Sequence, residues 1–401
     1  MKRLTLLLLG LALGVASTAS AQGLTMQMSN GWSFSFSGNV NAFWVFTKGT
    51  NSGPTNSSVR TGLLPAFATF SASGKEAGLN LGVHFGFAPQ INNAGVHDQF
   101  GAQIDMRQVY LTIGFKDGSQ ILAGRELGVF SRQNILNDMT LFGVGAVGIA
   151  APGLGAGAQG GGTTLGRIGY GYLYPNFVPQ VTYSTKPGQA QLSIGLFQPS
   201  IFGQGTGTNA ASAAYVFTSI PRVEAEVTYN QKSGRNSYLL WAGGLWQTTK
   251  NAVTGGNSAT SFGGTAGIKA GLSELSIVVS GYIGTGLGTT LMFSGQEVAP
   301  SGTDLRKSDG GYAQLMYKVG PKTNLGASWG FSRLKNASAG ETAASGGNNS
   351  VRTQWNLATV GIYHQWTKSL KLVFEGSREQ EGIGAAAPAQ VDISGGFMLF
   401  Y

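Results

Sequence analysis

The sequence predicts an all-β fold, a transmembrane antiparallel β-barrel that most simply has sixteen strands. Three observations predict it. Apolar and polar residues alternate along many short segments, an export signal precedes the first of them, and only 11% of residues are charged although the mean hydropathy is +0.04. Alternation with a period of two gives each strand one apolar and one polar face. A barrel with a lipid-facing wall and a wet lumen uses both faces, whereas a soluble domain carries roughly 25% charged residues.

The N-terminus has the form of a secretory signal peptide. Lys2 and Arg3 precede an apolar run from Leu4 to Leu13, and Ala19-Ser20-Ala21 forms a small-x-small cleavage motif. We therefore expect residues 1–21 to be removed and residues 22–401 to form the mature barrel. The run is shorter than the roughly 20 residues of a transmembrane helix, and nothing later in the sequence is long and apolar enough either. A mature chain that spans a membrane must therefore do so as a closed barrel. The chain has no cysteine, which excludes disulfides and thiolate metal sites.

Sixteen segments alternate in this way, and tight turns and long loops connect them in strict alternation, as in a barrel of this kind. Removing 21 residues from 401 leaves 380, or 380/16, about 24 per strand with its connection; eighteen strands remain compatible. Such a barrel is too wide to be filled by side chains, so we expect an aqueous channel. The segments are 32–46, 64–73, 79–87, 107–115, 120–125, 177–185, 190–197, 221–230, 237–249, 261–270, 275–284, 311–319, 324–333, 351–366, 370–378 and 390–401.

The C-terminal residues resemble the assembly signal of bacterial outer-membrane β-barrels. Ser394, Gly396, Leu399 and Tyr401 fill its four places: a polar residue, a glycine, and two hydrophobic residues of which the second is terminal. The resemblance implies delivery by periplasmic chaperones and the barrel-assembly machinery to the bacterial outer membrane. There, lipid and lipopolysaccharide would surround the barrel.

The mature chain also resembles the Gram-negative general porin family. Phe36–Ala42 is similar to the family's opening strand, and Arg107–Gly114 followed by Ile121–Glu126 is similar to its paired strands that end in Gly-Arg-Gln. Glu126 departs from the usual glutamine. The resemblance implies a homotrimeric porin for passive diffusion of small hydrophilic solutes and ions. It also implies that the loop after strand five, residues 126–176, folds into the lumen and constricts the pore.

A glycine-rich stretch within this loop, residues 143–148, matches the pattern G-x-G-x-x-G. A dinucleotide site would need a strand before it, a helix after it and an acidic residue about 20 positions on. No Asp or Glu occurs from Met139 to Val223. We therefore interpret 136–154 as a compact inserted loop in which glycine and alanine permit close packing, with 155–162 as a flexible segment. An exposed flexible loop is the alternative.

Charge in the predicted lumen favours a weak anion preference. The mature net charge is +7, the +9 of the full chain less Lys2 and Arg3. A low-dielectric wall around a narrow pore concentrates the field of such fixed charges. Pairing between acids and arginines would cancel this bias. The candidate pore residues are the cations Arg125, Arg132, Arg167, Arg222 and Lys269 and the acids Glu126, Asp138, Glu224 and Glu226.

Catalysis is not expected. The three histidines, His84, His97 and His364, have no neighbours suited to a serine–histidine site, and no metal-ligand cluster stands out. We expect no cofactor and no nucleic-acid partner. Two alternatives to a general porin stay open. One is a substrate-selective channel of the same fold for anions or organic acids, and the other is a non-conducting adhesin or structural barrel whose lumen the loop occludes.

Overall fold

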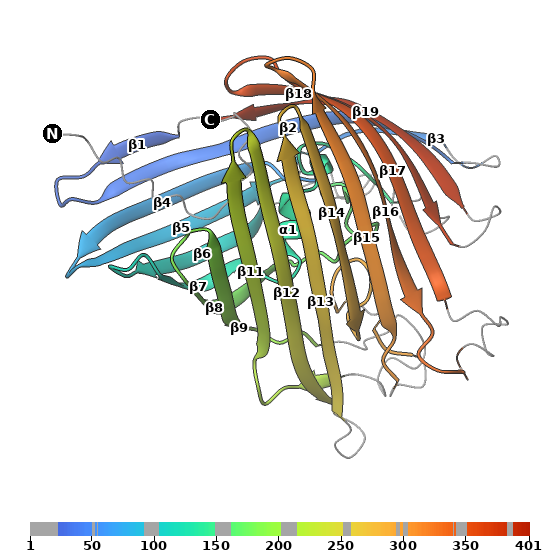
Figure 1. Cartoon of the computed structure of the whole chain (residues 1–401), viewed down its shortest axis with the longest axis horizontal. Helices are drawn as coiled ribbons and strands as arrows, with labels where there is room; N and C mark the ends of the chain where they lie inside the picture. The colour runs from blue at the N-terminus through green and yellow to red at the C-terminus, as the bar shows by residue number, and fades with distance from the viewer. Residues whose placement is uncertain are drawn as a thin grey trace.

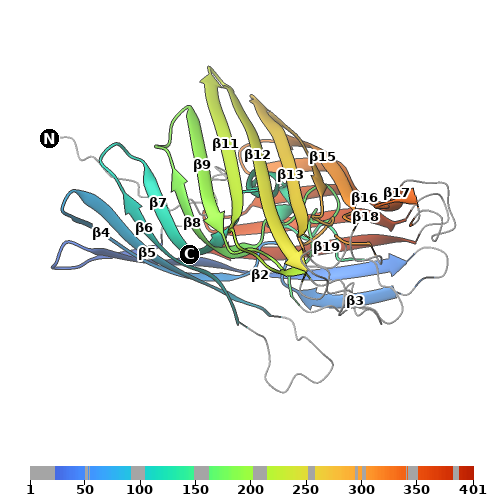
Figure 2. The same cartoon turned by 90° about the horizontal axis from the view of Figure 1, so that it is seen from below.

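One sheet of nineteen strands contains a closed antiparallel barrel of sixteen strand positions (Figures 1 and 2). The computed structural model describes residues 23–49, 53, 55–91, 104–148, 162–201, 215–251, 258–293, 297–299, 304–339, 341, 351–382 and 388–401. The predicted signal peptide and His97 lie outside these residues. The strands are β1 Leu24–Gln27, β2 Ser33–Gly49, β3 Thr55–Arg60, β4 Phe67–Glu76, β5 Leu79–Pro89, β6 Ile104–Gly114, β7 Gln120–Leu127, β8 Phe177–Ser184, β9 Ala190–Phe197, β10 Tyr215–Phe217, β11 Arg222–Ser233, β12 Asn236–Asn251, β13 Ser258–Leu272, β14 Leu275–Thr285, β15 Lys307–Lys318, β16 Thr323–Lys335, β17 Val351–Gln365, β18 Leu370–Glu381 and β19 Ala389–Phe400.

The two ends of the chain close the barrel. β19 pairs with β2 from Gln390 opposite Gly49 to Phe400 opposite Asn39. β1 pairs with the first residues of β2, which β19 does not reach. The same edge of β2 is therefore paired by the C-terminal strand along most of its length and by the N-terminal strand at its start. β1 and β10 are short strands added to the sixteen positions, and β3 and β4 together occupy one position beside β2. The predicted strand number is confirmed.

Alternation along each strand separates an outer from an inner face. On β19, Ile393 and Phe397 are more than half exposed, whereas Asp392, Ser394 and Met398 are at most 4% exposed. The same parity holds along β2, where Trp44 faces outward and its neighbours Phe43 and Val45 are buried. Rows of exposed apolar residues of this kind form the lipid-facing band of transmembrane barrels, and the predicted alternation is confirmed. No helix among the described residues is long and apolar enough to cross a bilayer.

Seven short connections gather at one end of the barrel, here called the short-turn end. One of three two-residue turns joins β4 to β5 through Ala77 and Gly78, with φ of +49° and +82°. Two consecutive positive φ values are the geometry of a type I′ hairpin turn, which glycine adopts without steric cost. The seven connections are residues 77–78, 115–119, 185–189, 234–235, 273–274, 319–322 and 366–369.

The predicted second strand, residues 64–73, is wrong at its start. β4 begins at Phe67, and β3 forms the rest of that wall position by pairing with Phe43–Lys48 of β2. Residues 61–66 leave the wall as an inward bulge and are buried. Asn41 of β2 holds the bulge, because its side-chain Nδ2 donates to Leu64 O at 2.9 Å and its Oδ1 accepts from Gly62 N at 2.9 Å. A polar side chain thus replaces the missing ladder bonds.

Candidate functional site

The chain between β7 and β8 lies against the inner face of the barrel. We call its described part, residues 128–148 and 162–176, the inner segment. It contains α1 (Arg132–Leu136) and the 3₁₀ helix η1 (Met139–Phe142), and Figure 1 shows α1 within the ring of strands. Asn134 anchors α1, since Trp241 Nε1 donates to its Oδ1 at 2.7 Å and its Nδ2 donates to Thr265 Oγ1 at 2.8 Å. Both partners are buried on the inner face of β12 and β13.

The glycine-rich stretch 143–148 binds carboxylates of β18. The backbone N–H groups of Val144 and Gly145 both donate to Glu375 Oε2 at 2.8 Å. Those of Val147 and Gly148 donate to Glu379 at 3.2 Å. Successive backbone N–H groups of this kind form anion-binding concavities. Here the anions are the protein's own side chains, so these groups are not available to a phosphate.

Two glycines in this stretch are required by close approach. A Cβ on Gly143 would lie 2.0 Å from Glu375 Oε1. Gly145 has φ of +59°, and a Cβ there would lie 2.6 Å from the backbone of Gly166. A side chain at either position would collide with atoms that the fold holds in place. The composition of the stretch therefore reflects packing. The compact loop was predicted for residues 136–154, of which 149–154 lie outside the described part, as do residues 155–161 of the predicted flexible segment 155–162.

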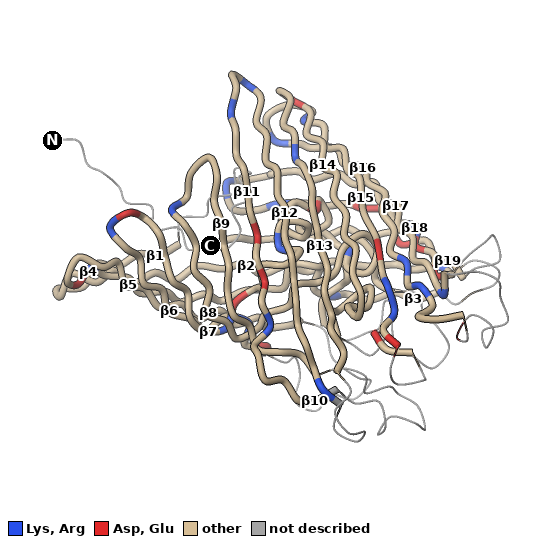
Figure 3. Tube along the Cα trace, turned by 60° about the horizontal axis from the view of Figure 1, so that its bottom comes forward, with Lys and Arg blue, Asp and Glu red and all other residues tan. Residues whose placement is uncertain are grey.

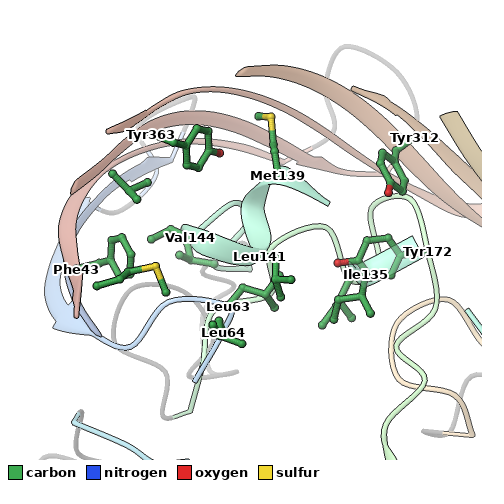
Figure 4. Close-up of a cluster of buried hydrophobic side chains, with 14 of the residues drawn as sticks. Phe43, Leu63, Leu64, Ile135, Met139, Leu141, Val144, Tyr172, Tyr312 and Tyr363 are labelled. Carbon is green, nitrogen blue, oxygen red and sulfur yellow. The ribbon is translucent and has the colours of Figure 1, made fainter. Parts of the chain in front are cut away.

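Apolar side chains fill the space between the inner segment, the inward bulge and the wall (Figure 4). Leu63 N donates to Gly143 O at 2.9 Å and Leu64 N donates to Leu141 O, so the bulge and the segment are also joined by backbone bonds. The cluster is nearly inaccessible to solvent. Its members include Phe43, Leu63, Leu64, Ile135, Met139, Leu141, Val144, Tyr172, Tyr312 and Tyr363.

Asp138 and Arg167 connect the two described parts of the inner segment, residues 128–148 and 162–176. Arg167 Nη1 donates to Leu357 O at 3.1 Å and its Nε lies 3.9 Å from Asp138 Oδ1. Asp138 Oδ2 accepts from Tyr172 OH at 2.9 Å. The side chains of Asp138 and Arg167 have no solvent exposure. These two predicted pore residues therefore anchor the segment and do not face the solution.

Two further predicted arginines are paired with acids of β11. Arg222 Nε lies 2.8 Å from Glu224 Oε1, and Arg132 Nη2 lies 2.6 Å from Glu226 Oε1. Arg222, Glu224 and Glu226 all point inward, and each is at most 4% exposed. The expected pairing of acids with arginines is observed here, and each pair carries no net charge.

A cavity of about 1020 Å³ lies between the inner segment and the inner faces of β2 and β4 to β7. Arg125, Glu126 and Arg132 line it. Within the described part of the chain, no carboxylate lies within 4.0 Å of Arg125. Glu126 Oε2 instead accepts from Gln108 Nε2 at 2.8 Å. The structure thus brings three of the predicted site residues to one cavity.

Lys269 and two residues outside the predicted site, His84 and Tyr110, also lie on the inner face of the barrel. Lys269 lies on β13, opposite Leu239 and Val278, and does not line this cavity. His84 and Tyr110, which the predicted site omitted, line the cavity with their rings stacked 4.7 Å apart. The inward parity of His84 was readable from the sequence, but its stacking partner on the next strand was not. In the described part of the chain, no three His, Cys, Asp or Glu side chains are placed to hold a metal ion.

Comparison with known proteins identifies the architecture. A family model described as Gram-negative porin matches residues 5–381. No curated protein matches the sequence. The structure resembles the outer membrane channel DcaP of Acinetobacter baumannii, with a TM-score of 0.66 and 15% identity over 94% of this chain and 99% of that one.

Two other solved structures are similar. An anion-selective porin from Comamonas acidovorans has a TM-score of 0.60 and 13% identity, over 92% of this chain and 100% of that one. OmpT of Vibrio cholerae in a trimer form has a TM-score of 0.54 and 12% identity, also over 92% and 100%. At these identities the similarity concerns the fold.

Proposed function

The chain belongs to the Gram-negative porin family, and we propose that its barrel is an outer-membrane channel for passive diffusion of small hydrophilic solutes and ions. The observation that carries the proposal is a closed sixteen-position wall with an apolar outer face and a polar inner face that borders a cavity of about 1020 Å³. A water-filled lumen is what a barrel of this size provides. Neither a catalytic site nor a cofactor enters this mechanism.

The inner segment constricts the lumen in this proposal. Its support is the set of hydrogen bonds from Asn134 of α1 to β13 and from Gly145 and Gly148 to β18. These bonds hold the segment on that side of the barrel and leave the cavity along β2 and β4 to β7. Solutes would pass on the cavity side. Because the segment is held by buried hydrogen bonds and apolar contacts, its position would stay constant during conduction.

Selectivity would follow from the charges that stay unpaired. The side chains of Arg132, Arg167 and Arg222 lie within 4.0 Å of carboxylates, so they add little net field. Arg125 remains at the cavity, with Glu126 as the opposing acid. We expect the cation to prevail weakly, because the hydrogen bond from Gln108 partly compensates the Glu126 charge. The resulting anion preference is small.

A homotrimer is proposed for the assembled protein. One similar structure is a trimer form, and outward faces with small residues, such as Gly395 of β19, permit close contact between barrels. The proposal extends to lipid and lipopolysaccharide around the barrel. It also includes delivery by periplasmic chaperones and the barrel-assembly machinery through Ser394, Gly396, Leu399 and Tyr401.

One alternative is a barrel whose lumen the inner segment occludes, as in an adhesin or structural protein. The dense apolar cluster between the segment and the bulge favours it. A selective channel for anions or organic acids is the other alternative, supported by the apolar side chains that share the cavity with Arg125.

Single-channel recording separates these functions. The mature chain is refolded into a planar bilayer, and conductance and the reversal potential in a KCl gradient are measured. Stepwise conductance, in threes for a trimer, with a reversal potential of the sign for anions is the expected result. Conductance that saturates with one organic anion would favour the selective channel. Silence from a correctly folded, heat-modifiable barrel would contradict the diffusion channel.

A further inference from the structure

Cations gather at the short-turn end of the barrel. Eight exposed cations occupy or flank six of the seven short turns, whereas only the acids Glu76, Asp117 and Glu274 lie there. A further cation beside the last turn, Lys371, is buried and is not counted. Eight minus three leaves a balance of +5, most of the +7 of the mature chain. Figure 3 marks Lys and Arg positions in blue along the Cα trace, and several hairpin tips carry them. We call this set the basic rim: Lys75, Lys116, Lys186, Lys232, Arg235, Lys318, Lys322 and Lys368.

The basic rim is exposed and is not paired with acids. All eight residues are exposed, and within the described part of the chain no carboxylate lies within 4.0 Å of any of them. The opposite end differs, because Lys335 lies 2.7 Å from Asp309 and Arg352 lies 3.1 Å from Glu341. Among the described residues, eight exposed cations without an ion pair therefore lie at the short-turn end, and other exposed cations of this kind, such as Lys48, Lys250 and Lys307, lie at the opposite end.

Exposed aromatic side chains set the depth of the basic rim in the membrane. Tyr317 and Trp366 face outward and are 49% and 54% exposed. Lys318 follows Tyr317 directly, and Lys368 follows Trp366 by two residues. At about 3.3 Å per residue, these cations lie within roughly 10 Å of the rings. Aromatic girdles of barrels lie at the level of the lipid headgroups, so the basic rim reaches the phosphates.

The distribution of these cations around the barrel favours lipid over a compact partner as the ligand of the basic rim. The cations are spread over six hairpins, from Lys75 near the end of β4 to Lys368 between β17 and β18, and do not form one patch (Figure 3). An annulus of headgroups fits such a ring. The ring lies at the ends of the hairpins, where one leaflet of the bilayer surrounds the barrel.

We infer that the basic rim binds the headgroups of anionic phospholipids in the periplasmic leaflet. This inference rests on the proposed outer-membrane function, in which short turns face the periplasm. Attraction to an anionic membrane surface is worth about 1 kcal/mol for each lysine or arginine near it, a factor of roughly five in binding. The basic rim thus orients and anchors the barrel by contacts separate from those that line the channel.

Lipid selectivity tests the inference. Wild-type protein is reconstituted in phosphatidylcholine, and the association of spin-labelled phosphatidylglycerol relative to spin-labelled phosphatidylcholine is measured by electron paramagnetic resonance. Because both leaflets contribute to the average, we expect a ratio of about two to three for wild type. A rim variant and a control of equal charge from the opposite end are compared: Lys232→Gln/Lys318→Gln/Lys368→Gln and Lys48→Gln/Lys250→Gln/Lys307→Gln.

A ratio that falls toward one in the rim variant and stays at the wild-type value in the control supports the inference. A wild-type ratio of one, or an equal fall in both variants, overturns it. A third outcome also overturns the inference: the lipid ratio is one, and wild-type protein sediments with purified peptidoglycan whereas the rim variant does not. The basic rim would then bind cell-wall carboxylates. Conductance is recorded from the same samples, so failure of the channel and failure of lipid binding are distinguishable.

Discussion

Replacement of Glu375 by glutamine tests whether the inner segment is anchored by buried carboxylates. Glu375 Oε2 accepts the N–H groups of Val144 and Gly145 at 2.8 Å, and Oε1 accepts from Tyr363 OH at 2.6 Å. The amide of Glu375→Gln has nearly the same shape. It supplies one acceptor oxygen in place of two and turns an NH₂ group toward existing donors.

The cost follows from the number of bonds lost. Hydrogen bonds to a charged group contribute about 1.5–3 kcal/mol each, and a buried donor without a partner costs about 1–3 kcal/mol. At least one of the three bonds to Glu375 is lost, and the others are no longer assisted by charge. We expect docking of the inner segment to weaken by about 3 kcal/mol, roughly 100-fold in its equilibrium constant.

Single-channel recording measures the effect as transitions to a larger conductance. When the segment leaves the wall, the lumen widens, so Glu375→Gln is expected to show frequent transitions that wild type lacks. Glu381→Gln is the matched control, because Glu381 lies on the same strand and is exposed. Wild-type conductance and noise in a folded Glu375→Gln barrel would refute the reasoning.

Three further outcomes are expected. Arg125→Gln moves the reversal potential toward cation preference, whereas Lys250→Gln at the long-loop end leaves it unchanged; equal shifts would contradict the role of Arg125. Hydrogen bonds from the Ser119 hydroxyl and N–H lower the pKa of Asp117 in its turn, so its stabilising effect is present above the unfolded pKa and lost as pH falls through the lowered folded pKa. The thermal unfolding midpoint of Asp117→Ala should therefore lie below that of wild type at pH 6 and merge with it in acid; a constant difference would refute this. Val360→Arg, on the lipid-facing row of β17, should lower the unfolding free energy by about 2–4 kcal/mol; no change in denaturant titration would show that Val360 does not face lipid.

The strand pattern was readable from the sequence because each strand has the same two environments along its length. Phe397 and Leu399 face out and Asp392 and Ser394 face in, as period-two alternation requires. Where the environment changes within a strand, the prediction failed. Leu64 continues the apolar pattern of the second strand but lies in the inward bulge, which depends on Asn41 and on the inner segment.

The sequence could predict some of the residues that belong to the candidate site. It could not predict which residues they contact. Arg222, Glu224 and Glu226 were named as candidate pore residues from the sequence, and their side chains are buried on the inner face of β11. Glu375 and Glu379 have the same inward parity but were not selected, since nothing local to β18 indicates that the glycine-rich stretch lies against them. Their contacts span more than 200 residues of sequence.

The sequence by itself determined the export signal pattern, the number of barrel strands, the orientation of their faces and the charge of the short turns, because each of these depends on residues adjacent in the chain. Only the tertiary structure decided which charges are exposed to the channel. Arg167 is a buried anchor whereas Arg125 lines a cavity, and this difference arises when barrel closure brings β11 to β19 against a segment that follows β7. Burial and pairing depend on that long-range contact, and no local pattern encodes it.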